Sequence, residues 1–154
     1  MQYASLGKQD SLWVAIMEKA YACFRQGGVV NYSDLDGGWM SEAFSDLGYD
    51  SDQIWDVSNG DDLLNQISNE LAAGKAVTMA INTPYGGAPV IGSHAYTAVS
   101  VDTDAQGHKT LVLRNPWGID GIGHDGANDG YVRLTPLQAY GSFWGVISSN
   151  VGNL

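Results

Sequence analysis

The stretch that decides the fold is residues 93–117, SHAYTAVSVDTDAQGHKTLVLRNPW. Two runs of apolar and β-branched residues, 95–101 and 109–114, are separated by a short polar segment that contains glycine, which predicts two strands joined by a turn. In an antiparallel hairpin of this kind, residues whose numbers add to about 210 lie opposite each other. His94 and Asn115 are therefore expected to meet at the open end of the hairpin.

The face of the sheet to which His94 and Asn115 point depends on the register of the pairing. Successive side chains of a strand alternate between two faces, so a shift of one residue moves each side chain to the other face. The alternation of Val99 and Val101 with the leucines of the second strand favours an even sum, which places His94 and Asn115 on opposite faces. An odd sum places them together. A bulge, or a bend at Pro116, can change the register locally, so both registers stay open.

The first half of the chain is predicted to be helical. Apolar residues recur at helical spacing over residues 11–26, and shorter helices are predicted over residues 40–47 and 58–74. Ser58, three residues before Asp61, is the expected N-cap of the third helix.

The second half of the chain consists of short β-branched or aromatic runs between glycine-rich loops. Strands are predicted over residues 76–81, 95–101, 110–113, 131–134 and 143–148. The long loops 84–92 and 119–130 flank the histidine and follow the asparagine, where binding loops are expected. We therefore predict a single domain over residues 1–154, of the α+β class, with N-terminal helices packed on a mostly antiparallel twisted sheet or partial barrel.

The composition restricts the partners and the location of the protein. Its 154 residues include 7 Lys+Arg and 17 Asp+Glu, and the formal net charge of −10 argues against nucleic acid and anionic lipid while favouring cationic partners or calcium. No apolar run approaches the ~20 residues of a membrane-spanning helix, and the N-terminus carries no signal segment. The single cysteine, Cys23, cannot form an internal disulfide, so we expect a soluble protein that is cytoplasmic rather than secreted.

His94 and Asn115 together suggest a particular chemistry. A thiolate nucleophile needs a neighbouring imidazolium, and the imidazolium needs an acceptor on its other nitrogen to fix its ring orientation and tautomer. Asn115 can supply that acceptor, and Trp117 can cover the hydrogen bond and exclude water. Two plainer interpretations stay open: a structural histidine beside a strand, and a turn formed by Asn-Pro-Trp-Gly.

Three motifs resemble the calpain family of cysteine proteases, in the family's own order. The segment LWVAIMEKAYA, residues 12–22, is similar to the helix that opens the second protease subdomain of that family, and Gly37-Gly38 follows at a similar interval. His94-Ala95-Tyr96 and RNPWG, residues 114–118, are similar to the family's histidine and asparagine motifs. The resemblance extends over most of the chain, from about residue 12 to residue 143.

The resemblance implies one half of a papain-like fold. For the parent protein it implies a cysteine endopeptidase in which His94 is the general base and Asn115 its orienting partner. The sequence also departs from the family. Ser93 stands where a glycine is usual, the family's upstream nucleophile segment is not among these residues, and the stretch after Trp117, which is normally acidic and rich in tryptophan, is glycine-rich here. The glycine-rich stretch argues against the presence of the family's calcium site in this chain.

The sequence also contains one cysteine and one group of aspartates whose roles bear on a nucleophile and on a metal site. Cys23 lies inside the first predicted helix, with no glycine or helix N-terminus to activate its thiol, so a structural role is expected. Asp120, Asp125 and Asp129 could surround a calcium ion with oxygen ligands, and the resemblance points to this region. Solvated loop charges are the simpler interpretation, and we assign no metal.

We therefore expect the His/Asn subdomain of a calpain-like cysteine endopeptidase, inactive without an upstream cysteine-bearing subdomain and acting, in the intact enzyme, on protein or peptide substrates. The alternative is a non-catalytic calpain-like module that binds a peptide or partner protein without cutting it. Ser93 and the glycine-rich loops are compatible with that alternative.

Overall fold

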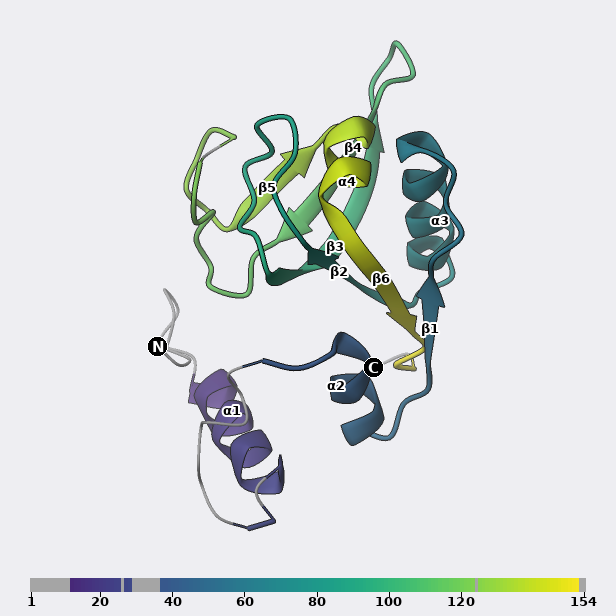
Figure 1. Cartoon of the computed structure of the whole chain (residues 1–154). Coiled ribbons are helices and arrows are strands. Elements are labelled where there is room, and N and C mark those ends of the chain that lie inside the picture. Colours follow the sequence, from purple (N-terminus) through teal and green to yellow (C-terminus); the bar gives the residue numbers. More distant parts are fainter. Residues whose placement is uncertain (1–11, 26, 29–36, 124, 153–154) are drawn as a thin grey trace. The chain divides into compact units, whose positions relative to one another are not determined.

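The computed structural model describes residues 12–25, 27–28, 37–123 and 125–152 (Figure 1). The chain divides between Trp39 and Met40 into two units, which are described separately. The prediction of one domain over residues 1–154 stays a prediction. The first unit contains helix α1, Leu12–Arg25, which confirms the helix expected over residues 11–26 for the residues described.

The second unit is an α+β structure built on one open six-stranded sheet. The strand order is β1-β6-β2-β3-β4-β5, and each neighbouring pair is antiparallel, which confirms the predicted class. Its elements are α2 Met40–Asp46, β1 Ser51–Ile54, α3 Gly60–Ala72, β2 Ala76–Ile81, β3 His94–Thr103, β4 Lys109–Arg114, β5 Tyr131–Leu134, α4 Pro136–Ser142 and β6 Phe143–Ser149. Within the described residues, no helix has the length and apolar character needed to cross a bilayer.

The core lies between one face of the sheet and the helices α3 and α4, which contact each other (Figure 1). Helix α3 buries Leu63, Leu64 and Ile67, the stripe that its helical spacing predicts. Strand β2 alternates between half-buried and buried residues, because every second side chain points into this core. The buried side chains of β2 are Val77, Met79 and Ile81.

The N-cap of α3 is Asn59, so the prediction of Ser58 was wrong. The Asn59 side chain accepts a hydrogen bond from the Asp62 backbone N–H at 3.0 Å. Ser58 instead donates from its backbone N–H, at 2.9 Å, and from its hydroxyl, at 3.0 Å, to the Asp62 carboxylate. These hydrogen bonds hold the pKa of Asp62 below its usual value, with the backbone N–H of Ser58 as the largest cause. Asn and Ser cap helices equally well, so composition alone could not separate two adjacent candidates.

Two elements were not predicted, the strand β1 and the helix α4. Strand β1 is polar apart from Ile54 and owes its conformation to pairing with β6. Helix α4 has only seven residues, too few for a helical period to be visible. A complete capping box between Thr135 and Gln138, with Pro136 in the first turn, starts the helix.

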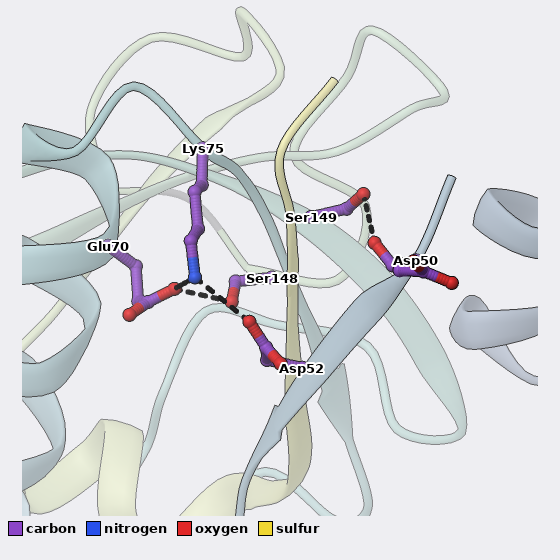
Figure 2. Close-up of polar contacts among 6 residues, drawn as sticks. All are labelled: Asp50, Asp52, Glu70, Lys75, Ser148 and Ser149. Carbon is purple, nitrogen blue, oxygen red and sulfur yellow. Dashed lines mark hydrogen bonds and ion pairs between the residues drawn. The ribbon is translucent and has the colours of Figure 1, made fainter. Parts of the chain in front are cut away.

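A polar cluster ties the end of α3 to strands β1 and β6 (Figure 2). The Lys75 ammonium lies 2.8 Å from the Glu70 carboxylate and 2.9 Å from that of Asp52. The buried Ser148 hydroxyl donates to Glu70 at 2.5 Å. Hydrogen bonding to Lys75, and then to Ser148, lowers the pKa of Glu70. The cluster fastens the short edge strand β1 to the rest of the sheet.

Glu70→Ala is expected to lower the free energy of unfolding at neutral pH by about 1–3 kcal/mol, because it leaves the buried Ser148 hydroxyl without its acceptor. The folded pKa of Glu70 lies below its ordinary value of 4.5, so its carboxylate contributes stability above that pH. This contribution is lost as the pH falls through the folded pKa. Urea unfolding of both proteins across this range measures the difference.

The matched control is Asp56→Ala, which removes an exposed carboxylate and should change the free energy of unfolding by no more than about 0.5 kcal/mol. If the difference between wild type and Glu70→Ala stays constant from neutral pH down to acid, the carboxylate of Glu70 contributes nothing to stability through its charge.

Candidate active site

A β-bulge in the hairpin sets which way His94 and Asn115 face. Near the turn, Val101 lies opposite Leu111, so the residue numbers add to 212; toward the open end Ala98 lies opposite Leu113, and they add to 211. The register shifts between Ala98 and Ser100, and Val99 is left out of the pairing and is 44% exposed.

The even register expected from the valines therefore holds only at the turn end. Beyond the bulge the register is odd, and the asparagine that follows β4 falls on the same face as the histidine that begins β3. The bulge lets Val101 pack on the core near the turn while Tyr96 and Ala98 pack on it near the open end.

His94 and Asn115 are hydrogen-bonded. The His94 Nε2 and Asn115 Oδ1 atoms lie 3.0 Å apart, and the same Oδ1 accepts the Trp117 backbone N–H at 3.1 Å. The other amide atom, Nδ2, points to the Asp120 backbone carbonyl at 3.5 Å. A flipped amide would set an N–H donor against the Trp117 N–H, so Oδ1 is the acceptor for both neighbours. His94 must then carry its proton on Nε2, which leaves the Nδ1 lone pair for another group.

Two aromatic rings hold the imidazole. The Trp117 ring centroid lies 4.5 Å from that of His94 at an interplanar angle of 42°, and the Tyr96 ring meets it edge-on at 5.0 Å. Asn115 is fully buried, whereas Trp117 is 58% exposed and lies with its ring against the imidazole. The role of Trp117 as a cover for the hydrogen bond stays a prediction.

Tyr96 is buried, and its hydroxyl accepts the Ile91 backbone N–H at 2.9 Å. Burial raises the pKa of this phenol, the Ile91 N–H opposes the shift, and the charge of Asp120 adds to it. Tyr96 thus joins the histidine strand to the loop 84–92. It was not among the predicted site residues, although its position two residues after His94 places both on one face of the strand.

Ser93 turns the chain into β3 with a φ of 52°, the one positive φ among the described residues that are not glycine. Its backbone N–H donates to the Asn82 carbonyl at 3.0 Å. The left-handed conformation explains why a glycine suits this position, since a side chain there costs roughly 1–2 kcal/mol.

The three aspartates considered for calcium are not brought together as a ligand set. Asp120 is buried and bonds Gly130, Asp125 pairs with Arg133 at 3.0 Å, and Asp129 accepts the Tyr131 backbone N–H at 2.9 Å. In the described part of the chain, no three His, Cys, Asp or Glu side chains are grouped to hold a metal ion. Cys23 is half-buried in α1, and its expected structural role stays a prediction.

Comparison with known proteins places the chain in a family. The family model described as "Calpain family cysteine protease" matches residues 1–127. The chain belongs to the calpain family of cysteine proteases. It is 28% identical over 127 residues to the calpain-type cysteine protease DEK1 of Zea mays, and 28% identical over 132 residues to the calpain-type cysteine protease ADL1 of Oryza sativa subsp. japonica; each match covers 75% of this chain. It is also 31% identical over 126 residues, 70% of the chain, to a thiol protease of Porphyromonas gingivalis.

The matched regions are small parts of these relatives. The chain spans 6% of the length of each plant protein and 25% of that of the bacterial one. The matches therefore show that the chain belongs to a family of cysteine proteases. They do not show the activity of the whole protein.

Proposed function

We propose that this chain supplies the His/Asn part of the active site of a calpain-like cysteine endopeptidase, with His94 as general base and acid and Asn115 as its orienting partner. The observation that supports this most directly is the 3.0 Å contact between His94 Nε2 and Asn115 Oδ1, with the indole of Trp117 against the imidazole ring. A merely structural histidine would not need an acceptor that is itself held in one orientation by a second N–H donor.

In the proposed reaction the nucleophile is a cysteine of a separate, upstream subdomain, positioned so that His94 Nδ1 faces its sulfur. The thiolate attacks the carbonyl carbon of a peptide bond, and the C–N bond breaks as the imidazolium gives its proton to the leaving amine. Water then attacks the thioester carbonyl while His94 takes a proton from it, and the C–S bond breaks to release the carboxylic acid product and regenerate the thiolate. Asn115 holds the ring of His94 in the required orientation throughout.

Complementation tests this proposal. The chain is mixed with the cysteine-bearing subdomain encoded upstream in the parent gene, and cleavage of casein is followed. We expect no cleavage by either part alone and cleavage by the mixture, abolished when the cysteine subdomain is alkylated beforehand. Cleavage by the 154-residue chain alone would contradict the assignment. A stable complex that binds casein without cutting it would support the non-catalytic module instead.

A further inference from the structure

Three hydrogen bonds form a closed ring beneath the His94 and Asn115 pair. The Asn115 backbone N–H donates to the Gly130 carbonyl at 2.8 Å, and the Gly130 backbone N–H donates to the Asp120 carboxylate at 2.8 Å. The ring closes where the Asn115 side-chain Nδ2 points to the Asp120 carbonyl at 3.5 Å. Asp120 therefore contacts Asn115 through its backbone and fastens the far end of the loop through its side chain.

Burial and hydrogen bonds fix the position of Asp120, although it lies in a loop. It is fully buried, and its backbone N–H donates to the Asn128 side chain at 2.8 Å. The next residue, Gly121, has a φ of 90°, and a Cβ there would overlap the end of the Ile91 side chain and lie 3.5 Å from Asn115 Nδ2. The loop 119–130 thus packs both on the loop 84–92 and on the Asn115 amide.

The 3.5 Å contact is the long member of the ring, so it depends on the loop remaining closed. The Asp120 carboxylate closes the loop by bonding Gly130, ten residues further along the chain. Without that bond the Asp120 carbonyl can move away from Nδ2. The buried amide of Asn115 then loses the acceptor of its Nδ2, and only the Trp117 N–H still holds its Oδ1 toward His94.

We propose that Asp120 is a positioning residue whose bond to Gly130 keeps its own carbonyl against Asn115 and so fixes Asn115 Oδ1 toward His94. The proposal deepens the function proposed above and rests on it for its catalytic consequence. Asp120 takes no direct part in the reaction in this scheme. Its effect reaches the imidazole through the orientation of a neutral amide, and therefore through the tautomer of His94.

The tautomer can be measured on the 154-residue chain without any nucleophile. Histidine labelled with ¹⁵N is observed by long-range ¹H–¹⁵N correlation at a pH of about 8.5, above the range in which free imidazole titrates. The His94 signals are assigned by their loss in His94→Gln. We expect the Nε2–H form to dominate in the wild type and its ratio to the Nδ1–H form to fall about five- to tenfold in Asp120→Ala.

Two variants make the comparison specific. Asp120→Asn keeps an oxygen that can accept the Gly130 N–H and should restore the wild-type ratio. Asp129→Ala removes the neighbouring exposed carboxylate, which bonds Tyr131 and does not touch Asn115, and should leave the ratio unchanged.

If Asp120→Ala does not fold, Asn128→Ala weakens the same loop from an exposed position, and we expect a shift of about twofold in the same direction. An unchanged ratio in the folded Asp120→Ala, or in Asn128→Ala where it is needed, would overturn the proposal.

Measurements of activity distinguish the positioning role of Asp120 from the proposed function of the chain. In the complemented enzyme, Asp120→Ala should lower kcat on the order of 10- to 100-fold with KM nearly unchanged, because it misplaces a group without touching the substrate. If complementation yields no protease but the tautomer shifts as expected, the proposed function fails and the positioning role stands. If complementation succeeds and Asp120→Ala keeps full kcat, the positioning role fails and the function stands.

Discussion

His94→Ala is expected to lower the kcat of the complemented enzyme by about 10³-fold or more, with little change in KM. The substitution removes the base that maintains the thiolate and the acid that protonates the leaving amine, and loss of either role slows the reaction. Substrate binding depends on other surfaces, so ground-state affinity should persist. Initial rates of peptide hydrolysis at several substrate concentrations measure both constants.

The control for this experiment is His108→Ala. His108 lies in the exposed turn between β3 and β4 and pairs with Asp104 at 3.0 Å, so it shares the residue type without the surroundings of His94. It should keep full kcat. Full activity of His94→Ala would remove His94 from the mechanism, whatever the geometry around it.

Gly60→Ala is expected to destabilise the second unit by about 3 kcal/mol, the upper end of the usual cost of overpacking. Gly60 begins α3, and a Cβ there would overlap the backbone carbonyl of Pro136 and lie 2.9 Å from the Pro136 side chain. The obstacle is backbone at the start of α4, so it cannot be relieved by a change of rotamer. The two helices would have to separate, which opens the core that they share. Urea unfolding monitored by circular dichroism measures the loss.

Gly37→Ala is the matched control. It makes the same chemical change where a new Cβ meets nothing within 4 Å and φ is not in the left-handed region. It should change the free energy of unfolding by no more than about 0.5 kcal/mol. Equal stabilities of the two variants would mean that α3 and α4 do not pack as closely as the structure describes.

The sequence predicted the parts of the fold that carry a clear local pattern. Strand β2 was expected over its observed residues because they form a short run rich in β-branched side chains, and α3 because its leucines and isoleucine form one stripe. Strand β1 could not be predicted in this way, since a polar segment becomes a strand only when a partner strand supplies its hydrogen bonds. The capping box of α4 is visible in the sequence. It marks where a helix can start, but it does not show whether the seven residues that follow form one.

The candidate site shows the same division. Proximity of His94 and Asn115 followed from the hairpin, because both lie at its open end under any nearby register. Their common face did not follow, because the valines and leucines near the turn favour an even register and only the bulge at Val99 makes it odd beyond. Asp120 was considered as a metal ligand, and no local pattern indicated that its partner would be the backbone of Gly130, which folding brings close.

The bulge at Val99 has one more consequence, for protein engineering. It lies between the turn and the end of the hairpin that carries His94, and it changes the register of the pairing there. The turn at residues 104–108 extends away from the sheet (Figure 1) and is exposed to solvent. An affinity tag or a fluorescent reporter grafted there would label the protein at a distance from the histidine, the asparagine and the indole that covers them.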